Sequence, residues 1–220
     1  MSQPAAPDQP HRRTPSNWNV PNALTTLRIV MVPFFGWALL HDGGHDLLWR
    51  WIAFVLFALA MLTDKIDGDL ARKHDLVTDF GKIADPIADK AMTGMAFIGL
   101  AIIADFMPAW LWWTITVLVL VREWGVTFAR LSIAKEIVMP AKQSGKVKTT
   151  MQALALGGFV APFGLLDGGL ALVGDALWWI SALALAVAVV LTMTSGYEFA
   201  RDVVRHRAGR PTEVERQQQA

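Results

Sequence analysis

Two neighbouring stretches of the chain combine a membrane-like segment with closely spaced carboxylates. They are LWRWIAFVLFALAMLTDKIDGDLAR at residues 48–72 and GKIADPIAD at residues 81–89. The first begins as an apolar run long enough to cross a bilayer. The run ends, and the second stretch begins, among four aspartates: Asp64, Asp67, Asp85 and Asp89. Carboxylates are costly near a bilayer, so a cation or a function must hold them there.

The spacing of the aspartates indicates what they could do. Asp64 and Asp67 are three residues apart, and Asp85 and Asp89 are four apart, so each pair lies along one face of a helix. Two such helices side by side would converge four carboxylates on one point. These hard oxygen donors, in a chain without cysteine, suit Mg2+ or Mn2+ rather than zinc. A pair of such ions would suit a diphosphate substrate.

The residues between the aspartates fit the same interpretation. Gly68 has no Cβ, which would let a nucleotide or a neighbouring helix approach the backbone. Gly81 could separate a short polar loop from the helix that follows it. Arg72 offers a planar donor for a phosphate or for orienting an aspartate.

The pattern D-x2-D-G-x2-A-R-x8-G-x3-D-x3-D resembles the signature of the CDP-alcohol phosphotransferase family, and all eight fixed positions match. Three further segments, at residues 20–28, 122–127 and 145–150, resemble the bacterial branch that makes phosphatidylglycerophosphate. The resemblance implies an enzyme of phospholipid biosynthesis. It would transfer the phosphatidyl group from CDP-diacylglycerol to sn-glycerol 3-phosphate and release CMP.

The resemblance also implies roles for individual residues. The metal ligands would be Asp64, Asp67, Asp85 and Asp89, holding two Mg2+ or Mn2+ ions, and Asp89 would also be the catalytic base. Residues expected to border the CDP donor are Asn22, Thr25, Arg28, Gly68, Ala71, Arg72 and Gly81. Asn22 and Thr25 could equally be helix-capping residues.

The acceptor site must be sought among basic residues. Arg122 and Arg130 lie eight residues apart on one helix face, and Lys146 and Lys148 open the next apolar segment. A phosphorylated acceptor needs such a cluster. For Lys148 the alternative is a charge that only sets the membrane topology.

Composition predicts an all-α, polytopic membrane protein. The chain has 220 residues, 54% of them hydrophobic, and nothing alternates like a barrel strand. One membrane domain is expected at residues 21–207, between a disordered or surface-lying tail at 1–20 and a flexible tail at 208–220. Six spanning segments are predicted at about 22–41, 48–72, 82–104, 109–134, 147–166 and 174–203.

The charges predict the orientation of this bundle. Of the 20 Lys and Arg residues, all except Arg50 lie on the tails or on the second-to-third and fourth-to-fifth connections with their helix ends. The positive-inside rule then places both termini and the active site in the cytoplasm, with the protein in the cell membrane. Five tryptophans, expected to form an interfacial belt, mark the other side: Trp110, Trp112, Trp113, Trp178 and Trp179.

Other interpretations remain open at this point. The same family includes enzymes with other acceptors, such as cardiolipin synthase using phosphatidylglycerol, or phosphatidylinositol phosphate synthase. An ion or metal transporter would place its aspartates near the bilayer midplane, often within inverted repeats, and no repeat is visible here. The family resemblance implies a homodimer, which Gly94 and Gly99 could support through close helix contact. No nucleic acid is expected as a partner.

Overall fold

The computed structural model describes residues 19–73, 78–103, 107–133, 143–165 and 170–207, and every secondary-structure element in these ranges is a helix. This confirms the predicted all-α class. The elements in chain order are α1 Val20–Leu40, η1 His41–Gly44, α2 Leu47–Lys73, α3 Asp79–Ile103, α4 Ala109–Ile133, α5 Gln143–Val160, η2 Pro162–Leu165 and α6 Ala171–Arg207. The predicted tails fall almost wholly outside the described residues.

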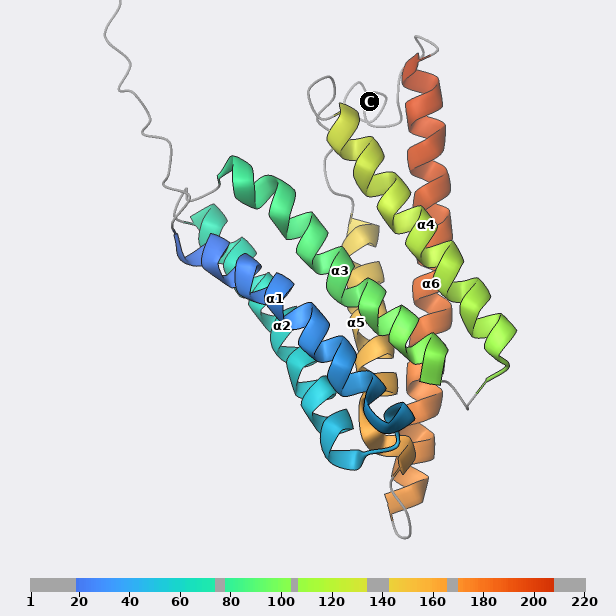
Figure 1. Ribbon diagram of the computed structural model, residues 1–220. Coiled ribbons are helices and arrows are strands. Elements are labelled where there is room, and N and C mark those ends of the chain that lie inside the picture. Colours follow the sequence, from blue (N-terminus) through green and yellow to red (C-terminus); the bar gives the residue numbers. More distant parts are fainter. Residues whose placement is uncertain (1–18, 74–77, 104–106, 134–142, 166–169, 208–220) are drawn as a thin grey trace, which may run out of the picture.

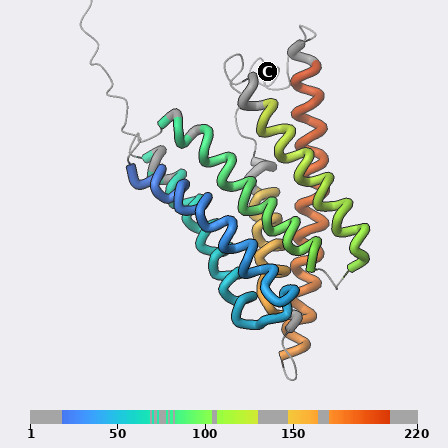
Figure 2. Tube along the Cα trace, viewed as in Figure 1, coloured from blue at the N-terminus to red at the C-terminus, as the bar shows by residue number. Residues whose placement is uncertain are grey.

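The helices form a bundle in which α1 packs on α2 and α3, and α5 packs on α6 (Figure 1). Helix α4 contacts α3 and α6. Helix α1 begins, α2 ends and α3 begins at one end of the bundle, which we call the aspartate end; α6 ends at the same end of the molecule (Figure 2). Helices α2 and α3 run in opposite directions, so the end of α2 and the start of α3 bring the two halves of the aspartate motif to the same end of the bundle (Figure 1).

Five segments of the described chain are long and apolar enough to cross a membrane. They are Val20–Gly44, Leu47–Gly68, Ile83–Ile103, Ala109–Ala129 and Ala171–Val204. The remaining predicted span, 147–166, corresponds to α5, which forms a helix but does not meet the same criteria. Its first turns are polar, which lowers its mean hydropathy, and it ends at Val160 just before Pro162.

The core lies where the helices cross, and glycines on α3 bring the helices close. A Cβ on Gly99 would come within 2.6 Å of Leu39 Cδ2 on α1, and one on Gly94 within 3.4 Å of Leu120 Cδ2 on α4. Both glycines therefore face neighbouring helices of the same chain. Buried around them are Phe35, Phe57, Phe97, Leu100 and Leu156.

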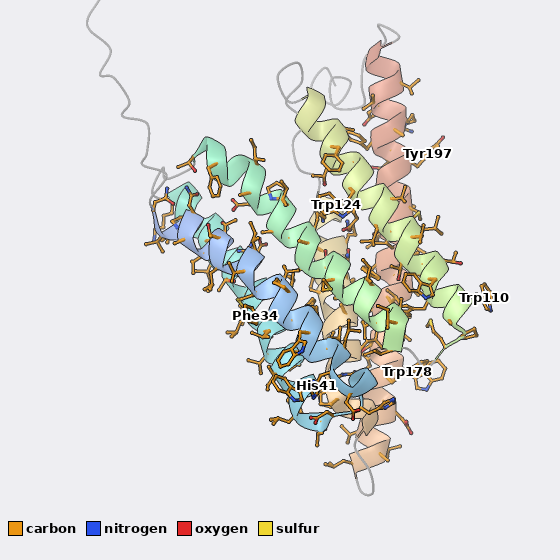
Figure 3. All side chains as sticks on the ribbon, in the orientation of Figure 1. Phe34, His41, Trp110, Trp124, Trp178 and Tyr197 are labelled. Atoms are coloured by element: carbon orange, nitrogen blue, oxygen red, sulfur yellow. The ribbon has the colours of Figure 1, made fainter. Side chains whose placement is uncertain are left out.

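The tryptophan belt is confirmed only in part. Trp110 and Trp179 are 70% and 69% exposed, and Trp110 and Trp178 lie toward the end of the bundle opposite the aspartates (Figure 3). The prediction was wrong for Trp112, which is fully buried and donates its indole N–H to the carbonyl of Phe97 at 3.2 Å. Because its indole N–H is satisfied by a backbone carbonyl inside the bundle, Trp112 can be buried away from the membrane–water interface.

Arg50, the basic residue expected on the non-cytoplasmic side, is a crosslink between elements. Its guanidinium donates from Nε to the carbonyl of Val160 at 3.0 Å, from one Nη to that of Phe159 at 2.7 Å, and from the other to that of Gly44 at 3.1 Å. Two of these acceptors are the last carbonyls of α5, where a helix end carries negative partial charge. Arg50 thus caps α5 and ties α2 to η1.

Replacing Arg50 should therefore destabilise the fold. Arg50→Met removes three donors, and a buried acceptor left without a partner costs about 1–3 kcal/mol. We expect the thermal midpoint of the purified protein to fall by about 5 °C or more. Lys65→Met, a cation lost from an exposed position of the same helix, should change the midpoint by less than about 1 °C. Equal midpoints for the two variants would contradict the capping role.

Candidate active site

The aspartate end is built on the first turns of α1 and α3. Asn19 caps α1, with its side-chain oxygen accepting from the backbone N–H of Asn22 at 2.9 Å. Thr78 caps α3 in the same manner, accepting from the N–H of Gly81 at 3.0 Å. The Asn22 side-chain amide then donates to Thr78 Oγ1 at 2.9 Å. The alternative of Asn22 as a helix cap was wrong, because its side chain joins α1 to the start of α3.

Gly81 lies inside α3, two residues after the helix begins, so it does not separate a loop from the helix. A Cβ at this position would stand 3.0 Å from Asn22 Oδ1 and 3.3 Å from Thr78 Oγ1. These distances are tighter than ordinary contacts. The glycine therefore lets α1 and α3 approach each other beside Asp85, whose Oδ2 would be 3.7 Å from the same Cβ.

Arg28 joins α1 to the first pair of aspartates. Its side chain is fully buried, and one Nη donates to Asp64 Oδ1 at 2.7 Å while the other donates to Asp67 Oδ2. Asp67 is itself buried. A guanidinium is suited to bridging two carboxylates in this manner, since its donors lie in one plane. The contact places Arg28 against two predicted metal ligands.

Thr25 joins α1 to the second pair. Its hydroxyl lies 2.5 Å from Asp85 Oδ1 and 3.1 Å from the carbonyl of Pro21. The carboxylate of Asp64 is repelled by the charges of Asp67, Asp85 and Asp89, and the charge of Arg28 offsets part of this repulsion. The two aspartate pairs therefore lie near one another at the aspartate end.

Asp89 belongs to a second set of ionic contacts. Lys90 Nζ lies 3.1 Å from Asp89 Oδ2 and 3.2 Å from Glu123 Oε2 on α4. The other oxygen of Glu123 accepts from Lys148 Nζ on α5 at 2.5 Å. This chain of contacts connects three helices to the predicted base.

The predicted acceptor residues are only partly brought together. Lys148 is buried and is repelled by the charge of Arg122, so these two cations lie in the same region. Arg122 donates to Ser195 Oγ on α6 at 2.6 Å. Four predicted site residues lie on helices whose course is described, but their side chains fall outside the described part: Ala71, Arg72, Arg130 and Lys146.

The aspartates fit a hard divalent cation by the chemistry of their donors. Carboxylate oxygens are preferred ligands of Mg2+ and Mn2+, and Arg28 offsets only part of the crowded negative charge around Asp64. Within the described residues, however, no three His, Asp or Glu side chains are arranged closely enough to hold an ion in their present positions. Arg28, Thr25 and Lys90 each engage one or two of the carboxylates instead.

Three contact residues were missed by the sequence analysis: Thr78, Lys90 and Glu123. Thr78 is of a residue type favoured at helix N-caps and comes directly before the acidic Asp79, so the sequence did carry that signal. Glu123 carried a weaker one, since an acidic residue far inside an apolar run needs a partner. That its partners are Lys90 and Lys148 depends on helix packing.

The fold and the site can now be compared with known proteins. The family model for CDP-alcohol phosphatidyltransferases matches residues 18–194, a range that includes both aspartate pairs and Glu123. The chain therefore belongs to the CDP-alcohol phosphatidyltransferase family. It is an enzyme of this transferase class, and the family generally uses divalent metal ions.

Curated relatives show which members of the family this chain is similar to. The chain is 42% identical over 191 residues to the "Probable phosphatidylglycerophosphate synthase" of Mycobacterium tuberculosis, covering 87% of this chain and 84% of that one. It is 35% identical over 195 residues to the "CDP-diacylglycerol--glycerol-3-phosphate 3-phosphatidyltransferase" of Bacillus subtilis, covering 83% and 93%. The protein of that name from Rickettsia felis is 35% identical over 187 residues, covering 82% and 93%.

The Thr25 contact gives a direct test of the site geometry. Thr25→Val keeps the side-chain shape but removes the hydrogen bond to Asp85, and a bond to a charged group is worth about 1.5–3 kcal/mol. We expect turnover, measured as CMP release at saturating substrates, to fall by about tenfold or more. Thr26→Val is the matched control: its exposed hydroxyl bonds only to the carbonyl of Asn22 among the described contacts. Similar turnover in both variants would show that Thr25 does not orient Asp85.

Proposed function

We propose that this enzyme transfers the phosphatidyl group from CDP-diacylglycerol to sn-glycerol 3-phosphate, giving phosphatidylglycerophosphate and CMP. The observation that carries this proposal is the proximity of two aspartate pairs at one end of a membrane-type bundle, beside the ion-paired lysines Lys90 on α3 and Lys148 on α5. The printed names of the relatives support glycerol 3-phosphate as the acceptor.

The reaction divides naturally between the side chains of the site. The acceptor hydroxyl attacks the phosphorus next to the lipid, a new P–O bond forms, and the bond to the oxygen of CMP breaks. Asp89 receives the hydroxyl proton as that bond forms, acting as general base. Arg28 and Thr25 hold Asp64, Asp67 and Asp85 in place on the donor side. Asn22, Gly68, Ala71, Arg72 and Gly81 border the CDP group in this proposal.

Divalent ions complete the donor side. Asp64, Asp67, Asp85 and Asp89 would hold two Mg2+ or Mn2+ ions, which offset charge on the diphosphate and stabilise the departing CMP. The carboxylates of Asp64, Asp67 and Asp85 would then exchange part of their contact with Arg28 and Thr25 for contact with the ions.

The acceptor is assigned to the basic residues of α4 and α5. Arg122, Arg130, Lys146 and Lys148 would bind its phosphate, since a doubly charged group needs charge-assisted donors. Lys148 is buried, and a chain of ion pairs through Glu123 and Lys90 connects it to the predicted base, Asp89. A neutral acceptor such as serine would have no use for this cluster.

We further infer the orientation and assembly. With α5 counted as a short sixth span, both termini and the aspartate end face the cytoplasm of the cell membrane, in agreement with the positive-inside rule. The start of α1 and the end of α6 at the same end of the bundle support an even number of crossings (Figure 1). The family resemblance implies a homodimer.

The proposed reaction can be tested with the purified protein in detergent. We expect CDP-diacylglycerol to yield CMP with glycerol 3-phosphate, and much less with inositol phosphate, serine or phosphatidylglycerol. A strong chelator should abolish the release and excess Mg2+ or Mn2+ should restore it. Asp89→Asn, expected to be at least about 100-fold slower, is the inactive control. Preference for another acceptor would refute the assignment, and full activity in chelator would refute the metal requirement.

The acceptor cluster makes a separate prediction. Loss of Arg122, Arg130 or Lys146 deletes a charge-assisted contact worth about 1.5–3 kcal/mol, so the acceptor KM should rise by about tenfold or more in each alanine variant. The donor KM should move much less, because the diphosphate rests on the aspartate side. Equal rises in both KM values would indicate general disruption of the basic region, and unchanged acceptor KM values would place the phosphate elsewhere.

A further inference from the structure

A buried glutamate at the centre of an ion-pair network has no role in the reaction proposed above. Glu123, on α4, is 2% exposed. Its Oε1 lies 2.5 Å from Lys148 Nζ on α5, and its Oε2 lies 3.2 Å from Lys90 Nζ on α3. Each carboxylate oxygen thus serves one lysine, and three helices meet at a single side chain.

The network leads directly to the predicted base. Lys90 Nζ, besides its contact with Glu123, lies 3.1 Å from Asp89 Oδ2. An ammonium shared between two carboxylates fixes the position of both, because moving either one stretches an ionic contact. With Oδ2 of Asp89 engaged by Lys90, the other carboxylate oxygen can face the acceptor hydroxyl.

The same carboxylate keeps two cations close together. Lys148 is repelled by the charges of Lys90 and Arg122, and Glu123 offsets this repulsion by lying between the two lysines. An ammonium group has three N–H donors. Lys148 directs one of them to Glu123, which leaves two that can face an anion.

A purely structural role would not require these charges. Burying ions costs several kcal/mol each, and apolar side chains of similar size at such positions often give equal or greater stability. The network therefore suggests a function that needs charges at defined places, next to a site that handles phosphate groups.

We propose that Glu123 is a positioning residue that holds Lys90 on the catalytic base Asp89 and holds Lys148 toward the phosphate of the acceptor. Through its two oxygens, one carboxylate would thus influence both the chemical step and the binding of the acceptor. The Lys148 part of this inference rests on the proposed phosphorylated acceptor, whereas the Lys90 part rests only on the role of Asp89.

The test begins with Glu123→Gln, which preserves size but can no longer neutralise two lysines. We expect kcat to fall about tenfold and the acceptor KM to rise about tenfold, with the donor KM within about twofold of the wild-type value. The two lysine variants should separate these effects. Lys90→Met should lower kcat and leave the acceptor KM nearly unchanged, and Lys148→Met should do the reverse.

Double variants show whether Glu123 acts through the lysines. With Lys148→Met present, Glu123→Gln should change the acceptor KM by less than about threefold; with Lys90→Met present, it should change kcat by less than about threefold. Thr116→Val is the matched control, since it alters a buried polar group two turns away on the same face of α4. Its kinetic constants should stay within about twofold of the wild-type values.

Several outcomes would overturn the proposal. They are normal kinetics in Glu123→Gln, effects of Glu123→Gln that are equally large in the lysine backgrounds, or two lysine variants that change the same constant. If Glu123→Gln does not fold, the split between the lysine variants decides by itself. If the wild-type enzyme releases CMP with another acceptor, the proposed function fails separately. The Lys90 part is then judged by kcat with that acceptor, and an acceptor without phosphate overturns the Lys148 part.

Discussion

The buried guanidinium of Arg28 is the interaction on which the aspartate end depends. A fully buried cation must be paired, and here one planar group on α1 engages two carboxylates on α2. Thr25, three residues earlier on the same helix, reaches Asp85 on α3. Helix α1 contains no aspartate. Its contacts through Arg28 and Thr25 nevertheless set the relative position of both halves of the motif. Mutual repulsion around Asp64 makes this arrangement costly, which is typical of a site built for a cation.

Cations at the two ends of the bundle have different kinds of partner. At the end opposite the aspartates, Arg50 donates to three backbone carbonyls and its charge meets the negative end of α5. At the aspartate end, Arg28 and Lys90 meet carboxylates. Backbone carbonyls are too weakly basic to accept a proton in a reaction, whereas carboxylates can, and carboxylates are also preferred ligands of Mg2+ and Mn2+. The first arrangement stabilises the fold, and the second is suited to chemistry.

Helix α3 connects the two halves of the candidate active site. Asp85 contacts Thr25 on α1, and one turn later Lys90 joins Asp89 to Glu123 on α4. Glu123 in turn contacts Lys148 on α5. In the proposed reaction these halves correspond to the nucleotide donor and the phosphorylated acceptor. The base would then stand where the two substrates meet, which is the position that a direct transfer between them requires.

The sequence by itself determined the membrane-type helical class, helix positions close to those observed, and the signature that gives the family. These features are local: apolar run length and spacings of three or four residues are set by the geometry of one helix. Only the tertiary structure decided that Arg28 pairs with Asp64 and Asp67, that Trp112 is buried, and that Glu123 joins Lys90 to Lys148. Such partners lie on different helices, Thr25 and Asp85 being 60 residues apart. Helix packing, which no local periodicity encodes, selects them.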